Sequence, residues 1–294
     1  MKLSIIIVNY NTGGFLKDCL LSIKKASLAP NDYEVIIVDN DSGDDSLKQA
    51  LQVSFAGLHL IKNHENTGFA RGNNQGIKKS KGDYILLLNP DTLVEKNTFL
   101  TILDYMDNQK EVGIATCKVL LADGSLDDAC HRGFPTPWNA FCHFSGLSKV
   151  FPGSKLLNGY HQGFCALDKI HQIDSCVGAF MMIRRQTGEE LFWLDEDYFW
   201  YGEDIDFCYR AKLKNWKVMF VPTVKIIHHK GISSGIKSHT KHQTNASSQT
   251  RKAASKARFD VMRIFYQKHY IHKYPRILTS LVLMGINIKE KLAK

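Results

Sequence analysis

The sequence of 294 residues contains no apolar run that reaches the roughly 18 residues needed to cross a bilayer. Its seven cysteines are scattered without a CxxC pair, which argues against a zinc ribbon or a disulfide framework and fits a reducing cytosol. The apolar N-terminal stretch meets Asn9 too early for the core of a signal peptide. We therefore expect a cytoplasmic protein, and the composition, 44% hydrophobic and 23% charged, is that of an ordinary globular chain.

Two common phosphate-binding signatures are also missing. Neither GxGxxG nor GxxxxGK[ST] occurs, so the sequence excludes a dinucleotide fingerprint and a P-loop. The stretch 68–76 has glycines at positions 68, 72 and 76, with Arg71 and Asn74 among them. Because this stretch opens a predicted helix, we expect that it can still approach a diphosphate.

Acidic residues are scarce near the C-terminal end. Residues 237–294 contain 13 lysines and arginines but only 2 aspartates and glutamates, whereas the whole chain has a net charge of +9. Such a basic tail can contact an anionic membrane surface, or it can be the solvated face of a helix that packs back on the domain. No nucleic-acid reading module is present, so we expect no nucleic-acid partner.

Apolar runs separated by turn residues predict an α/β protein with a mostly parallel central sheet and helices on both faces. Buried strands are expected at 3–8, 33–38, 58–61 and 84–88, each followed by a helix. The later segments are expected to be one or two strands in 112–121, loops over the site in 122–170, strands at 174–183, 217–221 and 224–227, a polar linker at 230–250, and C-terminal helices at 250–270 and 277–284.

Carboxylates follow two of the buried strands. Asp39 ends the second strand and Asp91 ends the fourth, in the sequence Asn89-Pro90-Asp91. Because the carboxyl ends of parallel strands meet at one edge of a sheet, the two side chains are expected to share a crevice. The simpler alternative is that each Asp only caps the next helix or forms a turn.

A third acidic group, Glu203-Asp204-Ile205-Asp206, follows four consecutive aromatic residues at 198–201. Burial beside aromatic rings disfavours an ionised carboxylate and raises its pKa, which suits a proton acceptor. Positions i and i+2 of a helix do not share a face, so we expect either Asp204 or Asp206 to be catalytic and the other to be structural. An amphipathic helix with acidic residues at its start would look the same.

A pair of histidines, His228 and His229, follows the last predicted strand. A histidine at a strand end can bind a metal or donate to a phosphate, although for the pair taken alone a polar loop histidine is the favoured interpretation.

Taken together, these residues resemble the nucleotide-sugar glycosyltransferases of family 2, which have the GT-A fold, and within them the rhamnosyltransferase-like branch. The resemblance covers roughly residues 3–235. It is carried by five ordered motifs at 7–11, 38–42, 66–76, 88–91, and 177–180 combined with 201–206 and 228–233.

The resemblance implies roles for individual residues. Residues expected to hold the nucleotide are Asn9, Tyr10, Asn11, Asp39, Asn66, Gly68, Asn74 and Asn89. Asp91 matches the last Asp of the DxD metal motif, in which Asn89 replaces the first Asp, and His228 matches the histidine that completes the metal or diphosphate site. The implied cofactor is Mg²⁺ or Mn²⁺.

The same resemblance makes Asp204 the catalytic base, with Glu203 beside it. Residues expected at the acceptor site are Gly178, Ala179, Trp200, His131, Arg132 and Trp138. The implied domains are a GT-A domain at 1–235, with a nucleotide-binding half at about 1–110 and an acceptor-binding half at about 111–235, followed by a basic linker and C-terminal helices at 236–294.

The implied function is inverting transfer of rhamnose or another hexose from a dTDP, UDP or GDP sugar to a saccharide or lipid-linked saccharide, in cell-surface polysaccharide synthesis. The basic tail would then contact the inner face of the cell membrane peripherally. Two alternatives stay open: a sugar nucleotidyltransferase, for which the loop at 9–14 is a poor phosphate loop, and a non-catalytic nucleotide-sugar-binding protein with the same fold.

Overall fold

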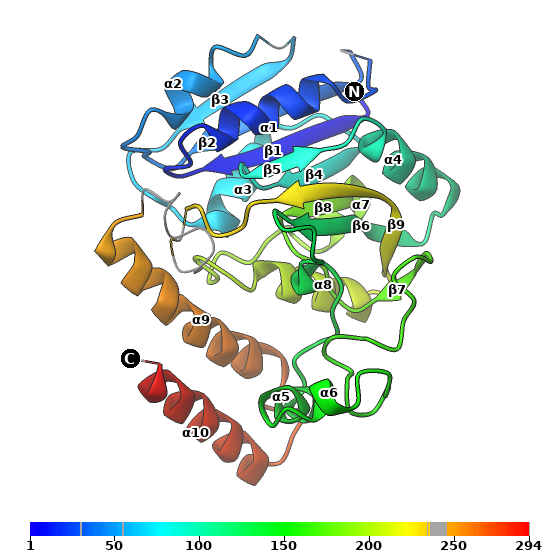
Figure 1. Cartoon of the computed structure of the whole chain (residues 1–294), viewed down its shortest axis with the longest axis vertical. Helices are drawn as coiled ribbons and strands as arrows, with labels where there is room; N and C mark the ends of the chain where they lie inside the picture. Colours follow the sequence, from blue (N-terminus) through cyan, green and yellow to red (C-terminus); the bar gives the residue numbers. More distant parts are fainter. Residues whose placement is uncertain (30, 55, 234, 236–245, 294) are drawn as a thin grey trace.

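The computed structural model describes residues 1–29, 31–54, 56–233, 235 and 246–293. Within them a nine-stranded mixed sheet has the order β3-β2-β1-β4-β8-β6-β9-β5, with β7 beside β9 (Figure 1). The strands are β1 (Leu3–Asn9), β2 (Tyr33–Asp39), β3 (Leu58–Lys62), β4 (Tyr84–Leu88), β5 (Thr92–Val94), β6 (Val112–Leu121), β7 (His171–Ile173), β8 (Phe180–Arg184) and β9 (Lys217–His228). The α-helices are α1 (Phe15–Lys24), α2 (Ser46–Ala50), α3 (Phe69–Lys79), α4 (Thr98–Asn108), α5 (Pro137–Phe144), α6 (Leu147–Val150), α7 (Arg185–Glu190), α8 (Glu203–Leu213), α9 (Ser248–His269) and α10 (Arg276–Leu292), and η1 (Asp128–Cys130) is a 3₁₀ turn.

The first four strands form the parallel part of the sheet, as the sequence predicts. β1 pairs with β2 and β4, and β2 pairs with β3, all in parallel. Every residue of β1, β2 and β4 is buried, which explains why their apolar runs do not alternate. The parallel register brings the carboxyl ends of β2 and β4 to the same edge, so the expected common edge for Asp39 and Asp91 is confirmed.

The glycines of the 68–76 stretch allow α3 to pack closely on β1. A Cβ added at Gly76 would lie 2.6 Å from Ile6 Cγ2, and one at Gly72 would lie 3.1 Å from both methyl carbons of Val8. These two glycines therefore serve helix-to-strand packing. The expectation that the 68–76 stretch approaches a diphosphate stays a prediction.

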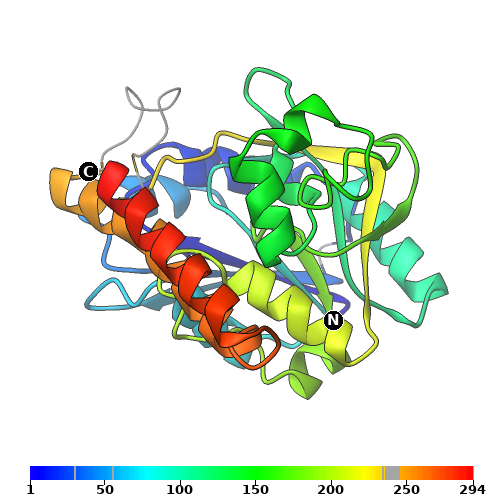
Figure 2. The same ribbon diagram turned by 90° about the horizontal axis from the view of Figure 1, so that it is seen from below.

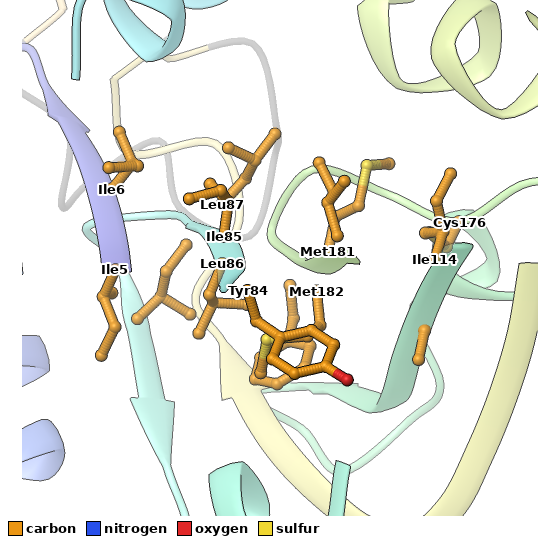
Figure 3. Close-up of a cluster of buried hydrophobic side chains, with 14 of the residues drawn as sticks. Ile5, Ile6, Tyr84, Ile85, Leu86, Leu87, Ile114, Cys176, Met181 and Met182 are labelled. Atoms are coloured by element: carbon orange, nitrogen blue, oxygen red, sulfur yellow. The ribbon is translucent and has the colours of Figure 1, made fainter. Parts of the chain in front are cut away.

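The second part of the sheet is mixed, because β8 runs antiparallel to its two neighbours while β6 and β9 keep the direction of the first strands. β8 pairs antiparallel with both β4 and β6, while β6 and β9 pair in parallel. Figure 3 shows the core where Ile5, Leu86, Ile114 and Met182 from four neighbouring strands meet. Each such fully buried side chain stabilises the fold by about 1.5–3 kcal/mol.

Two expectations for this part are corrected. Residues 217–228 form one strand, β9, with an irregularity in its pairing with β6, so the two strands expected at 217–221 and 224–227 are continuous. Strand character begins at Phe180 rather than at 174, because Phe180 N–H closes a turn on the Val177 carbonyl at 3.4 Å. The structure also adds β5, which pairs with β9. With three residues, β5 is too short for the sequence pattern to reveal it.

The C-terminal helices lie below the sheet, with α10 running along α9 (Figures 1 and 2). Phe265 and Tyr266 of α9 are buried in the domain core, so the interpretation of the tail as a helix packed back on the domain is confirmed for α9. α10 has no buried residue and is held on α9 by contacts such as Tyr266 Oη to Thr279 Oγ1 at 3.2 Å. The expected polar linker falls mainly on residues 234 and 236–245, which lie outside the described residues.

In the described part of the chain, none of the helices has the length and apolar character that crossing a membrane requires.

Candidate active site

A hydrogen-bonded network surrounds Asp39 at the end of β2. Asn9 Nδ2 donates to Asp39 Oδ1 at 2.7 Å and also lies 3.0 Å from the hydroxyls of Ser42 and Ser46. The Ser42 N–H donates to Asp39 Oδ2 at 3.2 Å. Asn9 is completely buried, so it orients Asp39, whose carboxylate remains slightly exposed. Asn11 acts on the neighbouring loop, because its Oδ1 accepts from Gly43 N–H at 2.8 Å.

A second network holds the loop before α3. Asn66 Oδ1 accepts from Gly68 N–H at 3.0 Å, and Asn40 Nδ2 donates to the Gly68 carbonyl at 3.1 Å. Gly68 has φ +86°, and a Cβ there would lie 2.6 Å from the Phe199 carbonyl oxygen. Gly68 therefore permits the close approach of the loop that precedes α8. The Phe69 N–H donates a hydrogen bond to the same Phe199 carbonyl oxygen at 2.8 Å.

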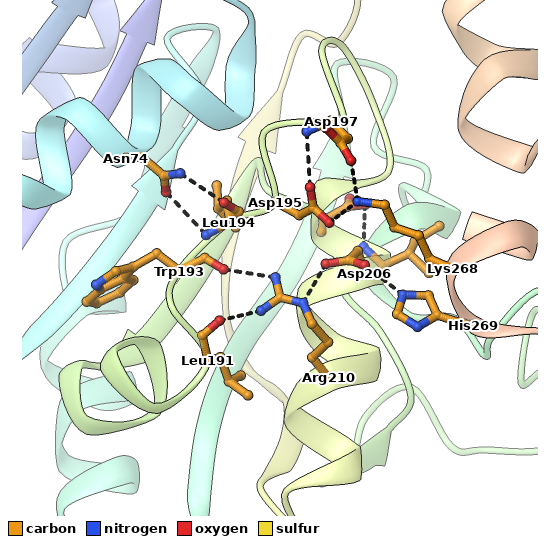
Figure 4. Close-up of polar contacts among 12 residues, drawn as sticks. Asn74, Leu191, Trp193, Leu194, Asp195, Asp197, Asp206, Arg210, Lys268 and His269 are labelled. Carbon is orange, nitrogen blue, oxygen red and sulfur yellow. Dashed lines mark hydrogen bonds and ion pairs between the residues drawn. The ribbon is translucent and has the colours of Figure 1, made fainter. Parts of the chain in front are cut away.

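Asn74, expected at the nucleotide, has both side-chain atoms engaged elsewhere. Its Nδ2 donates to the Leu194 carbonyl and to Glu196 Oε1, each at 2.9 Å, and its Oδ1 accepts from Leu194 N–H at 3.2 Å (Figure 4). The structure thus gives Asn74 the task of fastening the 191–197 segment to α3. Arg71 makes only an exposed contact, 3.7 Å from Glu196.

The side of the site that is expected to hold the donor is a chain of charged groups that ends on Asp91. His228 Nε2 lies 3.2 Å from Asp91 Oδ1 and 3.2 Å from Asn89 Nδ2, while His228 Nδ1 lies 3.2 Å from Asp127 Oδ2. Lys230 forms an ion pair with the other oxygen of Asp127. Asp127 and His228 are buried, and both come from segments distant from Asp91 in the sequence.

These contacts determine the charge of His228. Burial alone would lower the pKa of His228, but the charges of Asp91 and Asp127 raise it to about 9. Burial opposes ionisation of Asp91, yet His228 lowers the pKa of Asp91 below its usual range. At neutral pH these charges favour an imidazolium between the two carboxylates. The ring of His229 lies 4.9 Å from that of Phe15, whereas His228 is the histidine in contact with Asp91, Asn89 and Asp127.

The side of the site that is expected to hold the acceptor contains Asp204, in the first turn of α8. Arg132 Nη2 donates to Asp204 Oδ2 at 2.7 Å, and the Ile205 N–H donates to Asp204 Oδ1 at 2.7 Å. Burial works against the charge of Arg132, but Asp204 raises the arginine pKa. Two buried atoms here have no hydrogen-bond partner among the described residues: Arg132 Nε and Glu203 Oε2. Such atoms are suitable contacts for a polar substrate, because they are already desolvated.

Glu203 has the raised pKa that is expected for a carboxylate buried beside the aromatic residues 198–201. Its pKa is raised well above the usual value, first by burial and then by the charge of Asp204. Glu203 also connects the two sides of the site. A Cβ added at Gly178 would lie 3.1 Å from Phe69 Cε1 and 3.6 Å from Glu203 Oε1, and the next residue, Ala179, accepts from Asn89 N–H at 3.2 Å.

Asp206 has the structural task that its position two residues after Asp204 predicts. Arg210 Nε donates to Asp206 Oδ2 at 2.7 Å, and His269 Nε2 lies 2.7 Å from Asp206 Oδ1 (Figure 4). Burial opposes ionisation, but the hydrogen bonds from His269 and Arg210 lower the pKa of Asp206. Asp206 therefore joins α8 to α9, and Gly202, one residue before α8, fits beneath Val261 of α9.

The remaining acceptor candidates divide between the crevice and its surroundings. Trp200 lies edge-on to Tyr10, with ring centroids 6.4 Å apart, and so spans from the acceptor side to the nucleotide side. Trp138 is 47% exposed on α5 and donates to the Leu156 carbonyl at 2.8 Å. His131 is buried against His171 and Phe220, and burial together with His171 lowers its pKa to about 4. Arg132 thus contacts Asp204, whereas its neighbour His131 packs in a separate cluster with His171 and Phe220.

Sequence reasoning missed Asp127 and Lys230. Asp127 lies in the aperiodic 122–170 region, where no strand end or motif singles it out. Asp127 lies just before η1, and its Oδ1 accepts a hydrogen bond from the Ala129 N–H at 3.0 Å, as an ordinary helix cap does. Only the fold brings Asp127 to His228. Among the described residues, the three side chains with metal-ligand spacing are His131, Cys165 and His171, and they are separate from Asp91.

Comparison with known proteins identifies the family. The model of glycosyl transferase family 2 matches residues 4–151, and that of glycosyl transferase family group 2 matches residues 84–286. The chain belongs to glycosyl transferase family 2, in the rhamnosyltransferase-like branch that the sequence motifs indicate. Family membership favours a transferase over the nucleotidyltransferase alternative.

Individual relatives agree with this assignment. The chain is 28% identical to the rhamnosyltransferase WbbL of Escherichia coli K12 over 234 residues, which are 76% of this chain and 82% of the relative. It is 24% identical to the N-acetylglucosaminyl-diphospho-decaprenol L-rhamnosyltransferase of Mycobacterium tuberculosis H37Rv over 248 residues, 79% of this chain and 78% of the relative. S. aureus TarS 1-349 in complex with UDP-GlcNAc shares the GT-A fold with a TM-score of 0.58 and 17% identity, over 97% of this chain and 71% of TarS.

Proposed function

We propose that this glycosyltransferase moves rhamnose or another hexose from a nucleoside-diphosphate donor to a saccharide or lipid-linked saccharide, with inversion at the anomeric carbon. The observation that carries the proposal is the arrangement of Asp91 and Asp204 on two sides of one site, connected through Asn89, Gly178–Ala179 and Glu203. The names of the E. coli and M. tuberculosis relatives support a rhamnosyl donor, and the second also supports a lipid-linked acceptor.

A divalent cation fits the Asp91 side. Asp91 Oδ1 and His228 Nε2 are 3.2 Å apart, and Asp127 holds the opposite nitrogen of the ring, as carboxylates do behind metal-binding histidines. Asp91 and His228 would hold Mg²⁺ or Mn²⁺ together with donor phosphates, which supply the other oxygen ligands. The cation would stabilise the negative charge that develops on the nucleoside diphosphate.

The proton transfer belongs to Asp204. The acceptor hydroxyl oxygen forms a bond to the anomeric carbon while the bond from that carbon to the diphosphate oxygen breaks, and the hydroxyl proton passes to Asp204. Arg132 fixes the orientation of the Asp204 carboxylate at 2.7 Å. Burial raises the pKa of Glu203 and so favours the protonated carboxyl, which can donate a hydrogen bond to the acceptor.

A thermal-shift panel tests the donor site. Wild-type protein is heated with dTDP, UDP or GDP, each with and without Mn²⁺. The correct nucleotide at 100 times its Kd adds about 2.7 kcal/mol of stability. In the Asp91→Asn variant we expect the Mn²⁺-dependent part of the shift to disappear, whereas Asp168→Asn, at an exposed acid away from this site, keeps it. If none of the nucleotides shifts the wild-type transition, the proposed function is wrong.

The membrane contact is proposed for α10 rather than for the whole basic tail. Its exposed apolar side chains recur at helical spacing and form one stripe: Ile277, Leu281, Met284, Ile288 and Leu292. Lys289 and Lys291 flank that stripe, and Lys289 Nζ lies 3.9 Å from the ring centroid of Phe144 on α5, itself half exposed. An apolar stripe bordered by lysines matches the surface of a bilayer with anionic lipids.

Vesicle sedimentation tests this contact. Met284→Asp is expected to lose binding to vesicles that contain phosphatidylglycerol, while Leu213→Asp, which places the same charge on an exposed apolar site of α8, is expected to bind like wild type. Equal sedimentation of the two variants would assign the membrane contact to another surface or to none.

A further inference from the structure

Three side chains outside the proposed donor and acceptor sites converge on one point: His131 after η1, Cys165 in the following loop, and His171 at the start of β7. We propose that these residues form a binding site for a Zn²⁺-class transition metal ion. The site is separate from Asp91, and its role is to hold the 159–171 loop against the segment that carries Arg132.

The distances suit one small ion. The ligand atoms of the three residues all lie within 4.8 Å of one another, and His131 Nε2 is 2.6 Å from His171 Nε2. Two nitrogens on a tetrahedral Zn²⁺ are about 3.3 Å apart, given Zn–N bonds of about 2.0–2.1 Å. A small rotation of the two rings therefore admits the ion without movement of the backbone.

The hydrogen bonds around the cluster leave the correct atoms free. His171 Nδ1 lies 2.8 Å from the Lys169 carbonyl oxygen, which can only accept, so Nδ1 carries the proton and the Nε2 lone pair points at His131. His131 is buried and neutral, and its Nε2 points back at His171. Without an ion the two nitrogens must share a proton. With an ion both bind it.

The ligand types select the metal. Two imidazole nitrogens and a thiolate sulfur suit Zn²⁺ and its neighbours, whereas Mg²⁺ prefers oxygen. Cys165 is the least buried of the seven cysteines, which lets its thiol proton leave to solvent as the metal–sulfur bond forms. Three protein ligands leave a fourth position for water. The spacing of positions 131, 165 and 171 contains no CxxC signal, which is why the sequence alone gives no hint of it.

The position of the cluster connects it to the active site. Residues 127–132 carry three contacts in succession: Asp127 binds His228, His131 faces His171, and Arg132 binds Asp204. An ion on His131 would restrain Arg132 through the adjacent peptide bond. Loss of the ion is then expected to lower sugar transfer by weakening the positioning of Arg132.

Metal binding by the full chain provides the direct test. Protein stripped of metal with a chelator is titrated with Zn²⁺ against a chromophoric competitor. We expect one tight Zn²⁺ per chain that millimolar Mg²⁺ does not displace. Cys165→Ser and His171→Ala are each expected to weaken that binding at least tenfold, while His272→Ala, at an exposed histidine outside the cluster, leaves it unchanged.

Co²⁺ supplies a spectroscopic signature of the sulfur ligand. We expect a thiolate-to-cobalt charge-transfer band in wild type and in Asp91→Ala, and its loss in Cys165→Ser. Retention of the band in Asp91→Ala keeps this test independent of the proposed donor site. Circular dichroism of the metal-free variants shows whether each is folded. Should His171→Ala fail to fold, Cys165→Ser, which differs from wild type by one atom, decides the matter.

The proposal is overturned if wild-type protein binds no Zn²⁺ tightly, or if Cys165→Ser binds Zn²⁺ and gives the cobalt band as wild type does.

Discussion

Two parts of the site, the network around Asp39 and the 127–132 segment, are built from contacts of different range. Around Asp39 the partners come from the first two strand–helix units, since Asn9 and Asp39 are 30 positions apart on neighbouring strands. In the 127–132 segment, Arg132 reaches Asp204 over 72 positions, and Asp127 reaches His228 over 101. The Asp39 network is thus assembled by the sheet itself, whereas the contacts of the 127–132 segment depend on an irregular insertion packed onto the sheet.

This difference indicates which residues of the site are most sensitive to substitutions in their surroundings. A residue fixed by strand register, such as Asp39, stays in place as long as the sheet folds. Arg132 and Asp127 lie on a segment with little regular structure, so their positions depend on a few contacts at 127–132. We therefore expect substitutions in these two parts of the site to differ in their effects on catalysis and on the free energy of unfolding.

The largest effect is expected at Asp204. Asp204→Asn removes the proposed proton acceptor, and a general base typically contributes about 10²–10⁴-fold to the rate. We expect kcat for sugar transfer to fall by about 10³-fold, with the Kd of the donor nucleotide within a few fold of wild type. Rate measurement and nucleotide titration of the same preparation check this. A large loss of nucleotide binding would mean that Asp204 belongs to the donor side.

Asp206→Asn, two positions away, is expected to change stability instead. It removes the acceptor of Arg210 and His269 between α8 and α9, and breaking a buried ion pair costs about 3 kcal/mol in the free energy of unfolding. Urea denaturation measures the change. Asp260→Asn, in an exposed pair on α9, serves as the control, with an expected change of less than about 1 kcal/mol.

The Asp206 effect has a defined pH dependence. Because the folded-state pKa of Asp206 is lowered, its stabilisation is present above the unfolded pKa of about 3.9 and is lost as the pH falls through the folded pKa. The difference in unfolding free energy between wild type and Asp206→Asn is therefore expected to shrink below about pH 4. A difference that stays constant down to pH 2 would show that the pair contributes through packing alone.

Asp127→Asn tests the 127–132 segment at its contact with His228. It removes the carboxylate behind His228 without touching Asp91, and such partners of metal-binding histidines typically change metal affinity about 10–100-fold. We expect the Mn²⁺ concentration for half-maximal activity to rise by that factor. An unchanged Mn²⁺ requirement would leave Asp127 with a structural role only.

The smallest effect is expected at Arg71, which lies within the 66–76 motif. Its side chain is more than half exposed and reaches only Glu196, and exposed ion pairs contribute about 0–1 kcal/mol. Arg71→Ala is therefore expected to change kcat/KM less than twofold. A tenfold loss of kcat/KM would show that Arg71 contacts the substrate, and the proposed site would have to be extended to it.

Much of the donor side could be predicted because its signal is local. Non-alternating apolar runs indicated the parallel strands, and a carboxylate after a buried strand must lie at the sheet edge. The sequence did not reveal that the glycines at 72 and 76 pack α3 on β1, since close packing and approach to a phosphate demand the same residue. It also did not reveal that Asn74, whose role at the nucleotide stays a prediction, holds the 191–197 segment.

The amino-acid sequence by itself determined the family, the parallel strands and the location of Asp39, Asp91 and Asp204, because strand periodicity and short motifs are local properties. Only the tertiary structure decided that His228 lies between Asp91 and Asp127, that Arg132 holds Asp204, and that α9 packs on the domain while α10 exposes its apolar stripe. Those features depend on burial and on the charge of distant neighbours, and neither quantity exists until the chain has folded.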